Sequence, residues 1–116
     1  MLFRSYALKL FRKAATVGLA PPDRDAAVAD LEVAIGRLRG TTTIDDDVAV
    51  GDLLAAAVAV ARTEGVDAES ALRGWAGRFR DRFRATEALA EAEGHTLRGL
   101  EPAAARDLWR RADPSA

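Results

Sequence analysis

Residues 48–61 constrain the fold most strongly, because every residue in this segment is apolar or glycine except Asp52. Alanine dominates the segment, and alanine is the strongest helix former, so we expect a helix here. A helix that is apolar nearly all round must be covered by other parts of a protein. The sequence therefore predicts that this helix is the central and most buried element of the fold.

The remaining sequence contains further segments with helical periodicity, separated by glycine or proline. Apolar residues recur within each segment at helical spacing, and charged residues occupy the other positions. Pro21 and Pro22 force extended backbone, and Asp23 and Asp67 are well placed to cap the helices that follow them. The predicted helices span residues 2–17, 24–39, 44–64 and 68–93, followed by a short helix from Pro102, with Thr43 as the N-cap of the third.

These signals predict an all-α fold, namely an antiparallel helical bundle of about four main helices plus a short C-terminal helix. The length of 116 residues suits a single domain over residues 1–116, and we expect residues 113–116 to form a loose tail. The inner face of the fourth helix is expected to place Trp75, Phe79 and Phe83 in the core.

Composition excludes several classes of function. The 17 basic and 18 acidic residues give a net charge of −1, which provides no electrostatic footprint for DNA or RNA. The chain has no cysteine, which excludes disulfides and cysteine-based zinc or redox sites. Its single histidine, His95, follows a helix-ending glycine, where we expect a surface turn. No apolar run reaches the roughly 18 residues that a membrane helix needs. We expect a cytoplasmic protein without a membrane partner.

Several blocks of the sequence resemble one protein family in their order and spacing. The blocks are KAATVG (13–18) followed by Pro22-Asp23, GDLLA (51–55), ARTEGVDAESALR (61–73), RFRDRFR (78–84) and Leu108-Trp109. Together they cover residues 9–112 and resemble the MazG type of nucleotide pyrophosphohydrolase. The resemblance implies an all-α bundle that forms dimers and hydrolyses nucleoside triphosphates to monophosphate and pyrophosphate with Mg²⁺.

The resemblance also implies a set of metal-binding carboxylates, in an "EExxE" pattern on the second helix and an "ExxD" pattern on the third. The corresponding residues here are Val33, Ala34, Arg37, Ala49 and Asp52, so Asp52 is the only retained ligand position. We expect Arg37 to take the place of the metal as the counter-ion of Asp52, because a lone charge in an apolar segment needs a partner. The alternative is that Asp52 faces solvent and Arg37 is an ordinary surface residue.

The resemblance leaves the phosphate-binding side intact. Arg78 and Arg82, one helical turn apart, match basic positions that would contact a triphosphate, and Trp109 matches a tryptophan beside the cleft. The alternatives are a solvated face in which Arg78 and Arg82 pair with Asp81 or Glu69, and a core role for Trp109.

These observations favour a degenerate MazG-like domain, catalytically inactive, that dimerises or binds a nucleotide or another anion without a cofactor. One alternative is an active, Mg²⁺-dependent nucleoside triphosphate pyrophosphohydrolase whose metal site combines Asp52 with displaced acids, among them Asp30, Glu32 and Asp47. Because Asp45, Asp46 and Asp47 begin the third predicted helix, they are better explained by the helix dipole than by a metal. Another alternative is a purely structural, partner-binding domain. The apolar third helix also predicts a homodimer.

Overall fold

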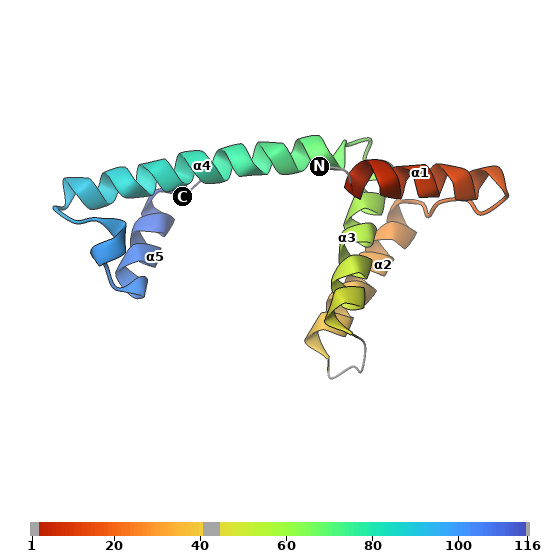
Figure 1. Ribbon diagram of the computed structural model, residues 1–116, viewed down its shortest axis with the longest axis horizontal. Coiled ribbons are helices and arrows are strands. Elements are labelled where there is room, and N and C mark those ends of the chain that lie inside the picture. Colours follow the sequence, from red (N-terminus) through yellow and green to blue (C-terminus); the bar gives the residue numbers. More distant parts are fainter. Residues whose placement is uncertain (1–2, 41–44, 116) are drawn as a thin grey trace. The chain divides into compact units, whose positions relative to one another are not determined.

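The computed structural model describes residues 3–40 and 45–115, with side chains from Tyr6 onward within these ranges. Every regular element in the described ranges is helical, which confirms the all-α prediction. The elements are α1 (Phe3–Thr16), α2 (Arg24–Arg39), α3 (Asp46–Thr63), α4 (Ala68–Ala92), the 3-10 helix η1 (Leu97–Gly99) and α5 (Pro102–Arg111) (Figure 1). The backbone contacts divide the chain into two compact units, residues 1–71 and 72–116. A single MazG-like bundle domain therefore stays a prediction.

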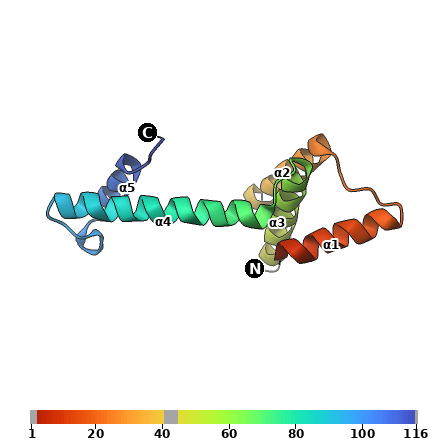
Figure 2. The same ribbon diagram turned by 90° about the horizontal axis from the view of Figure 1, so that it is seen from above.

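The first unit is built on an antiparallel pair of helices, α2 and α3, which lie side by side in Figures 1 and 2. Helix α1 also packs against α3, so α3 is the central helix of this unit, as the sequence predicts. Small side chains form the contact, and the buried ones are Ala27, Ala34, Ala49, Ala56, Val58 and Ala59. Val48, Val50 and Leu54 of α3 are nevertheless exposed, so the apolar helix is not covered on every face.

The helix starts follow the capping signals of the sequence. The Asp23 carboxylate accepts a hydrogen bond of 2.9 Å from the Ala26 amide at the start of α2. The Asp67 carboxylate caps α4 by accepting from the amides of Glu69 and Ser70, at 3.0 and 3.4 Å. Both N-caps are therefore confirmed.

The start of α3 differs from the prediction. The predicted N-cap, Thr43, lies outside the described residues, and α3 begins at Asp46 with Asp45 as its N-cap. The Asp45 carboxylate accepts a hydrogen bond of 3.3 Å from the Asp47 amide. Asp46 and Asp47 occupy the first turn, where negative charge interacts favourably with the helix dipole.

The end of α4 shows why glycine is needed at a helix terminus. Gly94 has a φ of +79°, and its amide donates to Glu91 O at 2.9 Å, while the amide of exposed His95 donates to Ala90 O at 2.9 Å. These two bonds form a Schellman motif, which satisfies the last carbonyls of the helix. Gly18 and Gly65 end α1 and α3 in the same way.

The second unit consists of α4 from Leu72 onward, η1 and α5. Helix α5 packs on the C-terminal part of α4, where Thr86, Ala90 and Leu108 are buried. The Thr86 hydroxyl donates to the carbonyl of Arg82 at 2.7 Å, so this buried polar group is satisfied within its own helix.

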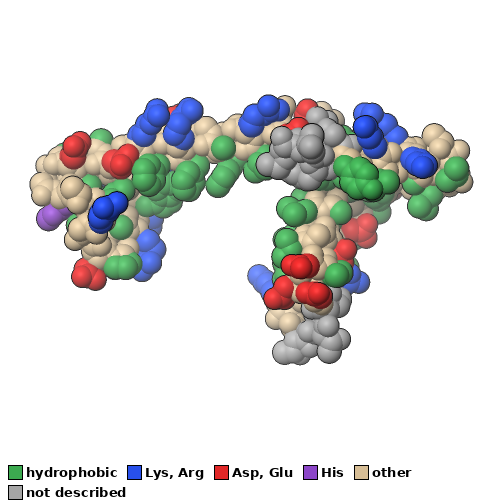
Figure 3. All heavy atoms as spheres, viewed as in Figure 1, with side chains coloured by type: hydrophobic (Ala, Val, Ile, Leu, Met, Phe, Trp, Pro, Cys, Tyr) green, Lys and Arg blue, Asp and Glu red, His purple; other side chains and the backbone are tan. Residues whose placement is uncertain are grey.

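The predicted burial of the α4 aromatics is wrong for this chain. Trp75, Phe79 and Phe83 are 53%, 45% and 43% exposed. Helix α5 has 10 residues and α4 has 25, so within the second unit α5 covers only part of the apolar side of α4. Figure 3 shows hydrophobic side chains gathered along one side of α4 and basic side chains on the opposite side.

None of the helices in the described ranges is long and apolar enough to cross a membrane. The longest of them, α4, carries many charged side chains along its length. The cytoplasmic location expected from the sequence stays a prediction.

We expect Gly94→Ala to lower the free energy of unfolding by about 1–2 kcal/mol, because alanine is strained at positive φ. The matched control is Gly77→Ala in the interior of the same helix, where the added methyl group meets only Arg80 Nη2 at 3.9 Å. This control should raise the free energy of unfolding by about 0.5–1 kcal/mol. Urea unfolding followed by circular dichroism measures both changes, and equal effects would contradict the assigned role of Gly94.

Candidate functional site

A cleft of about 360 Å³ lies between α2 and α3, and we call it the α2–α3 cleft. It contains most of the positions at which the family resemblance implies metal ligands. Val33, Ala34 and Arg37 reach it from α2, and Asp52 reaches it from α3. The remaining position, Ala49, is buried in the helix contact and does not line the cleft.

The predicted ion pair between Arg37 and Asp52 is present in this cleft. Arg37 Nη1 donates to Asp52 Oδ2 over 3.3 Å. Both side chains are about half exposed, at 45% and 48%, so the pair also contacts solvent. The sequence predicts an ion pair or two solvent-facing residues, and the structure agrees with each in part, because the charges are paired and yet lie at the surface. Whether the pair replaces a metal stays a prediction.

The displaced acids considered as substitute metal ligands do not all reach the cleft. Asp30 lines it together with Asp52, whereas Glu32 and Asp47 do not. Within residues 3–40 and 45–115, no three His, Cys, Asp or Glu side chains form a group that could hold a metal ion.

The second unit contains a different cavity, of about 460 Å³, which we call the aromatic pocket. The structure brings together here the three residues that the resemblance assigns to phosphate and base binding, Arg78, Arg82 and Trp109. The other lining residues are Trp75, Phe79, Asp113, Pro114 and Ser115. The pocket therefore combines aromatic rings with two cations and one carboxylate.

Most of the hydrogen-bonding capacity of Arg82 is used inside the protein. Its Nε and Nη2 donate to the carbonyl of Trp109 at 2.9 and 2.7 Å, and its guanidinium carbon lies 4.1 Å from the centre of the Trp109 ring. Its Nη1 lies 3.5 Å from Asp113 Oδ2. Arg82 thus holds α5 against α4, and its partners are neither Asp81 nor Glu69.

Arg78 differs from Arg82, because its guanidinium makes no ion pair with any described residue. Aromatic rings lie beside it in a continuous series. Trp75 and Phe79 have ring centroids 5.4 Å apart, and Phe79 and Trp109 have centroids 5.1 Å apart. The exposed ring of Trp75 therefore offers a stacking surface next to an available cation.

Asp113 and Ser115 line the aromatic pocket, although the sequence predicts that they belong to a loose tail. The amide and hydroxyl of Ser115 donate to Asp113 Oδ1 at 2.9 and 2.7 Å. These hydrogen bonds, with a smaller contribution from Arg82, hold the pKa of the Asp113 carboxyl below its ordinary value. The sequence does contain a signal for this turn, since an aspartate two residues before a serine, with proline between them, is typical of a hydrogen-bonded turn.

Comparison with protein-family models gives no match to this sequence, and a search of curated proteins gives none either. The resemblance to MazG proteins therefore depends on the blocks described above and stays a prediction.

Proposed function

We propose that this chain is a MazG-like helical domain that has lost magnesium-dependent hydrolysis and binds a nucleotide in its aromatic pocket. The observation that carries the proposal is the contact of 3.3 Å between Arg37 Nη1 and Asp52 Oδ2 in the α2–α3 cleft. It places a guanidinium beside the only carboxylate that the resemblance assigns to a metal.

The donor groups of the cleft fit a magnesium ion poorly. Mg²⁺ prefers near-octahedral oxygen ligands and is bound in proteins through one or two well-placed carboxylates. Of the two carboxylates that line the cleft, Asp52 is bonded to Arg37, and the guanidinium would lie close to any cation bound there. Two unit charges 4 Å apart repel by about 4 kcal/mol at an effective dielectric constant of 20. This repulsion supports the proposal that the domain has lost magnesium-dependent hydrolysis.

The aromatic pocket supports nucleotide binding. Arg78 provides a guanidinium without an ion-pair partner among the described residues, which suits phosphate oxygens. Trp75, with 53% of its surface exposed, provides a ring on which a base stacks. Because Arg82 is bound to Trp109 and Asp113, we assign phosphate contact to Arg78 and a positioning role to Arg82.

A second candidate function is favoured by one observation, namely that Asp30 and Asp52 both line the α2–α3 cleft. Mg²⁺ is bound in proteins through one or two carboxylates, so an active pyrophosphohydrolase with a rearranged site is the competing proposal.

We expect no pyrophosphate release when the purified protein is incubated with nucleoside triphosphates and Mg²⁺ or Mn²⁺, because Arg37 pairs with Asp52 and repels a cation beside it. A coupled pyrophosphate assay measures this, with Asp52→Asn and Asp30→Asn as comparison variants. Metal-dependent release that both variants abolish would establish the active alternative and contradict our proposal.

We expect nucleoside triphosphates to change the intrinsic tryptophan fluorescence without any metal, because both tryptophans of the chain line the aromatic pocket. Arg78→Ala should weaken binding about tenfold or more, since a hydrogen bond to a charged group contributes about 1.5–3 kcal/mol. Added salt should weaken it further.

The matched control for this titration is Arg73→Ala, which removes an exposed arginine of the same helix that does not line the pocket. It should leave the dissociation constant unchanged. A fluorescence response that is absent, or that the two substitutions reduce equally, would show that the pocket does not bind nucleotides.

We also propose that the chain forms a homodimer through the α2–α3 pair. Large apolar side chains outside the α2–α3 cleft are exposed on both helices, and they are Ile35, Leu38, Val48, Val50 and Leu54. An exposed apolar surface of this kind marks an interaction site, and a helix pair that meets its own copy across a two-fold axis completes a four-helix bundle.

We expect multi-angle light scattering to give the mass of a dimer, and Leu54→Glu to give a monomer, because a buried charge without a partner destabilises the interface. Val17→Glu is the control, since Val17 is exposed at the end of α1, outside the helix pair. A wild-type monomer at every concentration, or dissociation by the control as well, would contradict this interface.

A further inference from the structure

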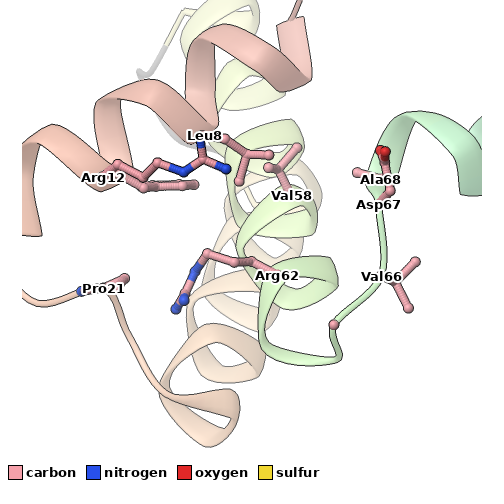
Figure 4. Close-up of a pocket in the computed structure, with 10 residues that line it drawn as sticks. Leu8, Arg12, Pro21, Val58, Arg62, Val66, Asp67 and Ala68 are labelled. Carbon is pink, nitrogen blue, oxygen red and sulfur yellow. The ribbon is translucent and has the colours of Figure 1, made fainter.

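A third cavity, of about 320 Å³, lies in the first unit, and Figure 4 shows it. We call it the α1–α3 pocket. It is bounded by α1, by the extended segment at Pro21 and by the C-terminal end of α3 with the turn into α4. Its volume is at the lower end of the roughly 300–1,000 Å³ that is typical of small-molecule sites.

One wall of the pocket is apolar. Val58, on α3, is 3% exposed, and Leu8 and Phe11, on α1, are half-buried. Leu8 and Val58 lie beside each other in Figure 4. A compact apolar group placed against this wall would be removed from water.

Arginine side chains from two helices provide the charge of the pocket. Arg62 extends from α3 toward the extended segment, where its Nη2 donates to Pro22 O at 2.9 Å. This bond positions the guanidinium, and the buried Nε of Arg62 has no hydrogen-bond acceptor among the residues that the structure describes. Arg12 of α1 lines the same pocket, is exposed, and makes no ion pair with a described residue.

Asp67, the one acidic side chain among the described lining residues, offsets only one of these two positive charges. Asp67 accepts hydrogen bonds from the amides of Glu69 and Ser70 at the start of α4, where the helix dipole stabilises its carboxylate. The pocket therefore combines an apolar wall with a net positive charge from Arg12 and Arg62.

We propose that the α1–α3 pocket binds an organic carboxylate with a small apolar body. The carboxylate accepts hydrogen bonds from the guanidinium of Arg12, whose planar fork matches its geometry, and the Arg62 guanidinium, held by Pro22 O, adds positive charge. The body packs against Leu8, Phe11 and Val58. An inorganic anion such as phosphate has no apolar part to place against that wall.

This site is separate from the aromatic pocket, which is lined by other residues in the second unit, and the inference does not depend on nucleotide binding there. It is, however, adjacent to the α2–α3 cleft, because Phe11 lines both cavities. A ligand that contacts Phe11 therefore touches a side chain that also bounds the cleft with the Arg37–Asp52 pair.

The test is isothermal titration calorimetry of the full chain with benzoate, compared with acetate and inorganic phosphate. We expect benzoate to bind at least tenfold more tightly than acetate or phosphate, because only benzoate has both a carboxylate and an apolar ring. Arg12→Ala should weaken benzoate binding about tenfold or more, and Arg12→Lys should also weaken it, since lysine lacks the fork. Leu8→Ala should reduce the preference for benzoate over acetate.

Arg39→Ala is the matched control, because Arg39 is an exposed arginine of the same unit that does not line the pocket, and its benzoate affinity should equal that of the wild type. Absence of benzoate binding, or equal affinity for benzoate and phosphate, would overturn the proposal. So would benzoate binding that Arg12→Ala leaves unchanged. Benzoate that changes the tryptophan fluorescence with the same dissociation constant would instead place it in the aromatic pocket, which also overturns this site.

Discussion

The close packing of α2 against α3 is the constraint on which the first unit depends. The contact consists largely of alanines, and Ala27, Ala34 and Ala59 are almost completely buried in it. Larger side chains at these positions would force the two helices apart, because protein interiors are close-packed. The short distance between the helices also brings Arg37 and Asp52 within hydrogen-bonding reach of each other. The same small residues therefore determine both the shape of the α2–α3 cleft and the charges that meet inside it.

The sequence predicts the helices well because their ends depend on local chemistry. The carboxylates of Asp23 and Asp67 cap nearby amides, and the positive φ of Gly94 ends α4 within its own turn. Burial of a helix face depends instead on a distant segment that must be long enough to cover it. The periodicity of Trp75 and Phe79 correctly places them on one face of α4, but α5 covers only part of that face. Periodicity identifies an apolar face without identifying what packs on it.

The candidate sites also differ in how far their contacts could be predicted from the sequence. The Arg37–Asp52 pair could be predicted, because the family resemblance assigns both positions to one metal site and a lone charge in an apolar segment needs a partner. The contacts of Arg82 could not be predicted, because they depend on how η1 orients α5 and thereby presents the Trp109 carbonyl. Asp113 was missed for a related reason, since a short polar terminus gives no sign of the side chain it will contact. Its turn with Ser115 was local and could have been recognised.

The energetic effect of the Arg37–Asp52 pair is small, because an ion pair that is half exposed contributes only about 0–1 kcal/mol to stability. Its main effect is electrostatic. The α2–α3 cleft sets two carboxylates, Asp30 and Asp52, against the single guanidinium of Arg37, so it repels phosphate groups, while Arg37 repels a cation near Asp52. The balance of positive and negative side chains differs in the aromatic pocket, because Arg78 and Arg82 face a single carboxylate, Asp113. By charge alone, the aromatic pocket, where Arg78 lacks an ion-pair partner among the described residues, therefore suits an anionic ligand better than the α2–α3 cleft does.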